Sequence, residues 1–323
     1  SLPHAYVACY HAGDWRISRF HKERRLDYLL TRKQGNSHIL SDKEIRTLVA
    51  RVADSQDVLF IVVATPVEEV GRDHDFDWAV IEPSSAQSIV QVAGRVNRHR
   101  TVAYGNSAAH NVAILQYNLK HCKNCEQGKP DRPAFVNPGY EKKGAATTYA
   151  KHDLARLLPW QGEELGIDAR LRLGGGSRFA SADDKAIAER VTPYFGVDRD
   201  GNEGLFNQTP VDAFRMASTP YEQTPLRDRN GHKQLWRMQL EDGNWTYFEW
   251  KMDAHSASWV RNEHELSTEK ALPNAWLALD PPAMENLCHE AGISPAEGLQ
   301  AELTAYENTA FIYNLGFGIR REN

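Results

Sequence analysis

A continuous apolar run that ends in a turn is the feature of this sequence that most constrains its fold. The run, Val58–Ala64, is rich in β-branched residues and is followed by Thr65 and Pro66. This pattern is typical of a central parallel strand that is buried on both faces. Open α/β sheets bind ligands beyond the carboxyl ends of their strands, so we expect the chemistry of this chain to follow Ala64.

A second apolar run is followed by a predicted helix. The run, Trp78–Ile81, is closed by a Glu-Pro pair, after which Ser84 or Ser85 caps a helix that continues to about Arg98. Side chains at spacings of three and four share one helix face. Four residues have that spacing here: Gln91, Gly94, Arg95 and Arg98.

This predicted helix face has the character of a phosphate site. Two arginines three residues apart repel each other, and a glycine inside a helix costs about 1 kcal/mol relative to alanine. An anion at that face offsets both penalties, and the planar guanidinium of arginine suits phosphate. The alternative is a solvated basic helix end with a glycine that serves packing.

The two elements occur together, in the order strand, acidic loop, strand, helix, and they carry a family resemblance. Ala64–Asp73 (ATPVEEVGRD) resembles motif V of the second RecA-like domain of superfamily 2 helicases, and Gln91–Arg98 (QVAGRVNR) resembles motif VI. More narrowly, Glu68–Asp77 together with Gln91–Arg100 is similar to the CRISPR-associated helicase-nucleases of type I systems. The wording of Arg72–Asp77 (RDHDFD) and the aromatic-rich tail favour the type I-F branch.

The resemblance implies roles for residues that would face a nucleotide. Such motors hold ATP with Mg²⁺ between two RecA-like domains. Arg95 and Arg98 would be the catalytic arginine fingers on the β- and γ-phosphates, a contribution of roughly 10³ to 10⁵ in rate where measured. Three residues are further candidates for ATP binding: Gln91 at the nucleotide end of the helix, Gly71 where the backbone approaches the ligand, and Asp73 near the ribose.

Four residues are candidates for DNA binding: Thr65, His11, Arg16 and Arg19. The Thr65 hydroxyl at the end of its strand can donate to a phosphate oxygen. The resemblance places His11 on the nucleic-acid side of the domain. Arg16 and Arg19 belong to a predicted basic helix that could follow a phosphate backbone. Simpler interpretations remain: Thr65 ends a strand, Gly71 serves a turn, Asp73 solvates a loop, and the basic residues form a solvated helix face.

Motifs of a complete motor are missing from the sequence. It contains no G-x-x-x-x-G-K-[ST] phosphate loop and no D-E-x-[DH] box for Mg²⁺. We therefore expect ATP and Mg²⁺ to be held mainly by a first RecA-like domain that this chain lacks, and the nuclease metal to lie in a missing HD domain. The chain is expected to be a C-terminal portion of a larger protein and to be inactive in isolation.

The predicted fold class is α/β. An incomplete second RecA-like parallel sheet is expected in residues 1–118, a linker region in 119–195, and a smaller mixed α+β, β-rich accessory domain in 196–323. The expected strands are Ala5–Tyr10, Asn111–Asn118, Lys233–Leu240, Asn244–Lys251 and Phe311–Ile319. The expected helices are Trp15–Arg32, one capped by Ser41, Tyr149–Leu158, Asp183–Val191 and Pro295–Asn308. Asn230-Gly231 and Asp242-Gly243 predict hairpin turns, and Gly174–Ser177 a flexible linker.

Composition narrows the class of protein. The chain of 323 residues is 41% hydrophobic and 25% charged, an ordinary composition for a soluble protein. Its net charge of -5 means that nucleic-acid binding must come from local patches. Its longest apolar run is too short to span a bilayer, so we expect no membrane association and a cytoplasmic location.

Cysteine and histidine patterns suggest two further chemistries, neither of which we favour. The four cysteines do not form a disulfide framework in a chain of this size. Cys122 and Cys125 could be half of a zinc site, completed by His110, His121 or His152, but no second C-x-x-C follows. His152-Asp153 has the wording of an HD metal dyad without placeable further ligands. We assign no metal site.

The sequence leaves three functional classes. The first is the C-terminal part of an ATP-dependent helicase-nuclease that translocates on single-stranded DNA in CRISPR defence, with an RNA-guided surveillance complex as partner. The second is another superfamily 2 motor, such as a restriction translocase or an RNA helicase. The third is a non-catalytic docking module on a RecA-like scaffold.

Overall fold

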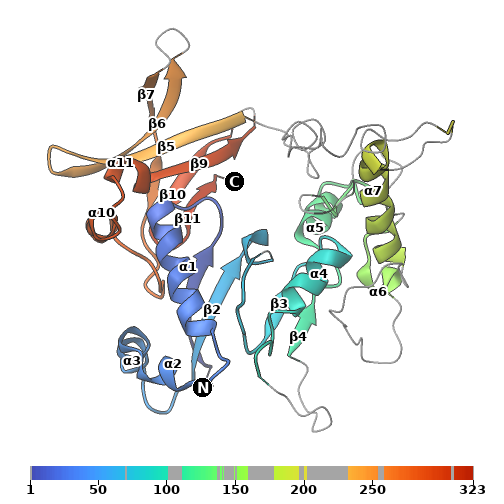
Figure 1. Ribbon diagram of the computed structural model, residues 1–323, viewed down its shortest axis with the longest axis horizontal. Helices are drawn as coiled ribbons and strands as arrows, with labels where there is room; N and C mark the ends of the chain where they lie inside the picture. Colours follow the sequence, from blue (N-terminus) through green and yellow to red (C-terminus); the bar gives the residue numbers. More distant parts are fainter. Residues whose placement is uncertain are drawn as a thin grey trace, which may run out of the picture. The chain divides into compact units, whose positions relative to one another are not determined.

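The computed structural model describes residues 2–69, 71–100, 111–136, 139, 141, 149, 151–158, 178–195, 200–201, 232–253, 258–306 and 309–322. The chain divides into two compact units (Figure 1). Unit 1 is formed by residues 1–75 together with 230–323, and unit 2 by residues 76–229. The division of the chain into domains at 1–118, 119–195 and 196–323 stays a prediction.

Unit 1 begins with two parallel strands joined by helices. β1 (His4–Tyr10) pairs in parallel with β2 (Val58–Ala64) along their whole length. The connection contains three helices: α1 (Arg16–Leu30), α2 (Ser37–Ser41) and α3 (Lys43–Val49). The strand–helix–strand order and the bounds of β2 confirm the sequence prediction.

The central, doubly buried position predicted for β2 is wrong. β1 is the inner strand, because on its other edge Val7 accepts a hydrogen bond from Trp276 N at 3.2 Å and donates one to the Asn274 carbonyl at 2.9 Å. β2 is half-buried along most of its length and exposed at its end. Its apolar run is covered in part by Trp276, whose ring packs edge-on against Phe60.

The N-cap of α3 also differs from the prediction by one residue. Asp42, not Ser41, accepts the hydrogen bond of Ile45 N, at 3.0 Å. Ser41 ends α2 instead, and its hydroxyl donates to the His38 carbonyl at 3.2 Å. The carboxylate of Asp42, one residue after Ser41, is therefore the N-cap of α3. Ile45 and Leu48 are buried, as expected.

The C-terminal segment of unit 1 contains a four-stranded antiparallel sheet in the order β7-β6-β5-β9. Its strands are β5 (His232–Glu241), β6 (Asn244–Asp253), β7 (Ser258–Glu265) and β9 (Gln300–Ala305). Asp242 and Gly243 connect β5 to β6 with φ of 48° and 80°, the left-handed pair that a tight hairpin requires. The hairpin turn predicted at Asp242-Gly243 is confirmed, whereas Asn230-Gly231 and Gly174–Ser177 lie outside the described residues.

The predicted helix Pro295–Asn308 is wrong. Helix α11 (Pro295–Gly298) is a single turn, after which the chain enters β9 and pairs with β5. Leu299 and Leu303 fit a helical stripe, but Ala301, Leu303 and Ala305 also fit the two-residue period of a strand, and these three are buried. The sequence fits both a helical and a strand periodicity here, and pairing with β5 favours the strand.

The end of the chain is a hairpin, not the single strand predicted for Phe311–Ile319. β10 (Phe311–Asn314) pairs antiparallel with β11 (Gly318–Arg321) and parallel with β8 (Ser267–Glu269). Asn314 Oδ1 accepts from the Gly316 and Phe317 amides and so stabilises the turn. Helix α10 (Pro281–Glu290) completes this segment.

One core joins the two segments of unit 1. Trp15, at the start of α1, is fully buried, and its ring contacts Tyr247 at 6.0 Å and Tyr313 at 5.5 Å between centroids. The Gly13 carbonyl accepts a 2.7 Å hydrogen bond from Ile319 N. Figure 1 shows α1 beside the strands of the C-terminal segment. The aromatic tail therefore contributes to the same hydrophobic core as Trp15 and Ile17 at the start of α1.

Unit 2 contains a small parallel sheet with helices. β3 (Ala79–Ile81) pairs in parallel with β4 (Val112–Ile114), as predicted. Its described helices are α4 (Ala86–Ala93), α5 (Leu119–Glu126), α6 (Leu154–Leu157) and α7 (Arg178–Phe195). Among its described residues, Ile81, Ile89, Phe135, Tyr149, Leu154 and Phe179 form a buried hydrophobic cluster.

The described residues thus have a mixed α/β architecture with a β-rich C-terminal segment. The parallel pairs β1–β2 and β3–β4 are two separate sheets. None of the described helices combines the length and apolar character that a transmembrane span requires.

Candidate functional site

The arginine-bearing segment of unit 2 is a short helix followed by a turn. Ser85 is the N-cap of α4 and accepts from Ser88 N at 3.0 Å. The helix ends at Ala93, with Gly94 as its C-cap. The prediction that four residues share one face of a helix reaching Arg98 is therefore wrong, because Arg95 and Arg98 follow the helix.

Main-chain pairing with Phe76 ends the helix early. Phe76 N donates to the Arg95 carbonyl at 2.8 Å, and Asn97 N donates to the Phe76 carbonyl at 3.0 Å. Asn97 has a φ of 50°, which a continuing right-handed helix does not allow. The turn therefore belongs to a bridge with the segment before β3.

The two candidate arginines differ in burial. Arg95 is only 6% exposed, whereas Arg98 is exposed and its Nη1 donates to the Gly94 carbonyl at 3.2 Å. Gln91 is exposed on α4. An anion can thus reach Arg98 and Gln91 from outside, but it can reach Arg95 only if that side chain becomes uncovered.

The N-terminus of α4 contacts Asp183, which is not among the site residues predicted from the sequence. Asp183, on α7, accepts from Ala86 N at 2.7 Å and from Gln87 N at 3.3 Å. The Tyr149 hydroxyl donates to the same carboxylate at 3.3 Å. Burial raises the pKa of Asp183 to about 6, against the opposing effect of these hydrogen bonds. No local pattern in the sequence indicates this contact, because Asp183 and Ala86 are 97 residues apart.

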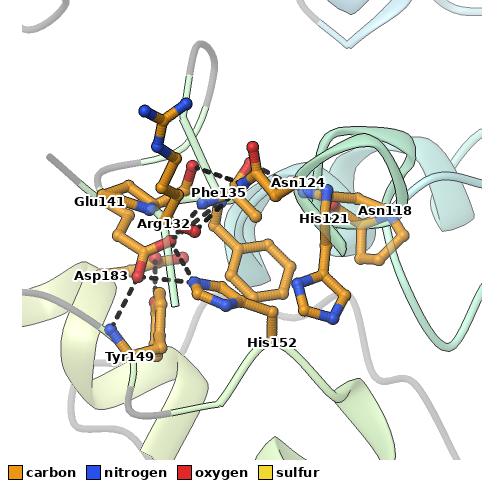
Figure 2. Close-up of polar contacts among 12 residues, drawn as sticks. Asn118, His121, Asn124, Arg132, Phe135, Glu141, Tyr149, His152 and Asp183 are labelled. Carbon is orange, nitrogen blue, oxygen red and sulfur yellow. Dashed lines mark hydrogen bonds and ion pairs between the residues drawn. The ribbon is translucent and has the colours of Figure 1, made fainter. Parts of the chain in front are cut away.

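A second buried carboxylate orders the chain next to Asp183. Glu141 accepts from Ala134 N at 2.7 Å, Phe135 N at 3.0 Å, Tyr149 N at 2.9 Å and His152 Nε2 at 2.8 Å (Figure 2). Burial alone would raise its pKa, but these hydrogen bonds outweigh burial and the pKa is lowered. His152 is thus a hydrogen-bond donor to Glu141. Asp153 caps α6, which begins at Leu154 and not at the predicted Tyr149.

The acidic loop after β2 belongs to unit 1. Thr65 is exposed, and its amide donates to the Tyr10 carbonyl at 3.2 Å. Gly71 has a φ of 74°, so its conformation alone accounts for a glycine. Asp73 is exposed and forms an ion pair with Lys33 at 2.6 Å. The roles predicted for these residues stay predictions.

A buried histidine fixes this loop to α1. His74 is 1% exposed and lies between Glu68, 2.6 Å from its Nδ1, and Asp27, 2.8 Å from its Nε2. Burial by itself lowers the pKa of His74, but the hydrogen bonds and charges of the two carboxylates outweigh burial and raise it. Nearby, Arg72 forms an ion pair with Glu23. The sequence predicts an acidic loop and a basic helix here, but it does not predict these contacts between them.

The ring of His11 is engaged by main-chain groups of unit 1. Its Nε2 donates to the Phe317 carbonyl, and its Nδ1 accepts from Gly13 N at 3.0 Å. The ring is therefore the neutral Nε2–H tautomer with both nitrogens used. Contact of His11 with DNA stays a prediction, and it requires one of these bonds to be exchanged.

The predicted basic helix presents fewer cations than its sequence suggests. Arg16 is exposed and Arg19 half-buried, so both remain accessible candidates. Lys22 points into the core and donates to Asp14 at 2.6 Å. Arg25 forms 2.8 Å ion pairs with Asp42 and Glu44.

The C-x-x-C pair lies on α5. Cys122 and Cys125 are exposed free thiols, and Cys125 Sγ is 3.4 Å from His121 Nε2. Within the part of the chain that the structure describes, no three His, Cys, Asp or Glu side chains are grouped to hold a metal ion. His110 lies outside that part.

Comparison with known proteins shows what these segments resemble. Residues 2–101 match the family described as CRISPR-associated nuclease/helicase Cas3, C-terminal. It is 37% identical over 155 residues to the CRISPR-associated nuclease/helicase Cas3 subtype I-F/YPEST of Pseudomonas aeruginosa. It is 36% identical over 153 residues to the protein of the same name from Pectobacterium atrosepticum.

The matches cover 48% and 47% of this chain but only 13% of each relative. The resemblance to CRISPR-associated helicase-nucleases, and to their type I-F branch, is confirmed by these comparisons.

Proposed function

We propose that this chain is the C-terminal part of an ATP-dependent helicase-nuclease that moves along single-stranded DNA and degrades target DNA in CRISPR antiviral defence. The observation that carries the proposal is the family match over residues 2–101, which includes both the loop after β2 and the arginine segment after α4. The parent protein would act in the cytoplasm, and its first RecA-like and HD nuclease domains and an RNA-guided surveillance complex would be its partners.

In this proposal the chain supplies one wall of an ATP site. Bound ATP with Mg²⁺ would supply the phosphoanhydride whose cleavage drives movement. Arg98 fits a phosphate contact best, since it is exposed on a turn fixed by main-chain bonds to Phe76. Arg95 is the second candidate finger and must be uncovered before it can act. Gln91 would order the nucleotide end of α4. By family resemblance, Gly71 would let the backbone approach the nucleotide closely and Asp73 would lie near the ribose.

Arginines suit this role because the charge on the transferred phosphoryl group must be stabilised as the bond breaks. A guanidinium donates through a rigid planar fork, whereas lysine offers a point charge. On the DNA side, Thr65, Arg16 and Arg19 are accessible donors to phosphate oxygens. These assignments rest on exposure and family position together.

The test uses this chain joined to the upstream first motor domain. Arg98→Ala is expected to lower kcat for DNA-stimulated ATP hydrolysis at least 10³-fold, as for other arginine fingers, while the affinity for single-stranded DNA without nucleotide is unchanged. Arg95→Ala is expected to do the same. Arg156→Ala, an exposed arginine of unit 2 paired with Asp153, is the matched control and should hydrolyse ATP like the unaltered protein.

Each outcome assigns the chain to one class. Wild-type ATPase in either finger variant rejects their assignment. DNA affinity that does not respond to nucleotide in the joined protein indicates a docking module instead of a motor. The 323-residue chain alone is expected to have no ATPase activity, and turnover by it would overturn the proposed division of labour.

A further inference from the structure

Two side chains accept hydrogen bonds from the backbone amides at the start of α4. A helix N-terminus leaves its first amides without intrahelical partners. Ser85 Oγ accepts from Ser88 N, which is local capping. The amides of Ala86 and Gln87 instead donate to the Asp183 carboxylate of α7, far away in the sequence.

We propose that Asp183 is a positioning residue that fixes α4 and, through it, the turn that carries Arg95 and Arg98. The proposal rests on the proposed function, because it gives Asp183 a role in placing the fingers for hydrolysis. The contacts that carry this role are the bonds of Asp183 to Ala86 N and Gln87 N, so it would act on the arginines through the helix.

Asp183 is itself firmly held. It is 4% exposed, and the Tyr149 hydroxyl donates to its second oxygen at 3.3 Å. The Tyr149 amide donates to Glu141, the buried carboxylate described above (Figure 2). The ring of Tyr149 also packs against Phe179, on α7, at 5.4 Å. The cap is therefore backed by a buried hydrogen-bond cluster and by aromatic packing.

Because α4 is short, a small tilt at its capped end displaces the arginine-bearing turn at its other end. α4 has eight residues, so it is about 12 Å long. A tilt of about 5° at its N-terminus moves its other end by about 1 Å over that length, and a displacement of about 1 Å in a catalytic group can cost about 100-fold in rate. The carboxylate also lies at the positive end of the helix dipole, which favours its ionised form.

The neighbouring residue provides a matched control. Asp184 has the same side chain on the same helix, but it is exposed. A general effect of charge on α7 should follow both residues, whereas capping of α4 should follow Asp183 alone.

The first measurement is hydrogen exchange of the Ala86 and Gln87 amides in the 323-residue chain. Loss of a cap is expected to raise local opening about 5- to 30-fold. We expect this increase in Asp183→Ala, and none in Asp184→Ala. In the chain joined to its upstream motor domain, Asp183→Ala should lower kcat for ATP hydrolysis about 10- to 100-fold, with the affinity for single-stranded DNA unchanged. Asp183→Asn keeps an acceptor oxygen and should lower kcat less than 3-fold.

A second measurement needs no variant. The amide proton shifts of Ala86 and Gln87 should titrate with the Asp183 carboxyl near its pKa of about 6, with Asp184 and Tyr149 as the neighbouring titratable groups. Flat titration curves, or unchanged exchange in Asp183→Ala, overturn the capping contact. This titration decides the contact even if Asp183→Ala does not fold.

The two proposals fail in different ways. If the Asp183 variants alter amide exchange but leave kcat unchanged, while Arg98→Ala abolishes hydrolysis, the positioning role is overturned and the motor function stands. If Arg95→Ala and Arg98→Ala both hydrolyse ATP normally, the proposed function fails, and the positioning role fails with it although the cap itself remains.

Discussion

The buried ion pair at the start of α1 makes a sharp prediction about stability. Lys22 and Asp14 are 1% and 3% exposed, with 2.6 Å between Nζ and Oδ2. The Asp14 carboxylate also accepts from the Ser18 hydroxyl at 3.0 Å and from Trp15 N at 2.9 Å. Asp14→Ala would leave the Lys22 ammonium in the core with only the Cys9 carbonyl, 3.0 Å away, as a described acceptor.

The expected loss follows from the burial of both groups. Removing one partner of a buried pair costs about 3 to 5 kcal/mol, because the remaining charge is uncompensated. With a urea m-value of about 2 kcal/mol/M, the midpoint of unit 1 should fall by about 1.5 to 2.5 M. Urea denaturation followed by tryptophan fluorescence and far-UV circular dichroism measures this shift.

A second variant separates charge burial from lost packing. Asp14→Ala combined with Lys22→Met also removes the buried, unpaired ammonium of Lys22, so the double variant should be more stable than Asp14→Ala alone. Lys233→Ala is the control, since it breaks an exposed 2.8 Å pair with Glu302 and should cost less than about 1 kcal/mol. A double variant less stable than Asp14→Ala would refute the reasoning.

Two further predictions concern titration and thiol chemistry. The raised pKa of His74 means that folding favours its protonated form, so this stabilisation is complete below the ordinary pKa of about 6.5 and is lost as pH rises through the folded value. Unfolding free energies measured from pH 6 to 9 should therefore fall more steeply in the unaltered chain than in His74→Gln, and parallel curves would contradict the assignment. Iodoacetamide should modify the exposed Cys122 and Cys125 of the native chain while Cys9 and Cys288 are protected, because the latter two are buried and burial raises their pKa. Mass spectrometry counts the adducts, and four adducts on the folded chain would contradict the burial of Cys9 and Cys288.

Local signals predicted much of the fold. The bounds of β2 came directly from an apolar run, and the Asp242-Gly243 turn from residues that tolerate positive φ. Predictions failed where a distant partner decided the outcome. The local spacing of β9 predicts a helix, because its pairing with β5 leaves no mark in the neighbouring sequence. The helical spacing after Ala93 predicts a longer α4, because it does not reveal the bridge between Phe76 and Val96.

The same limit applies to the candidate site. Motif wording identified the segments that contain Thr65, Arg95 and Arg98, since these residues lie in short contiguous stretches. It did not identify Asp183, whose partner amides are distant in the sequence, nor the placement of His74 between Glu68 and Asp27. Such contacts depend on tertiary packing, so a single sequence contains no local pattern for them.

The interrupted course of unit 1 has a consequence for how the chain emerges from the ribosome. His11 meets the Phe317 carbonyl across 306 residues of sequence. At about 5 to 20 residues per second, translation of that interval takes roughly 15 to 60 s. Until the C-terminal segment has been made, Trp15 lacks the rings of Tyr247 and Tyr313 that it contacts in the folded unit, whereas the contiguous unit 2 can fold first. We therefore expect the segment that contains β1 and α1 to be exposed to aggregation during synthesis for longer than unit 2.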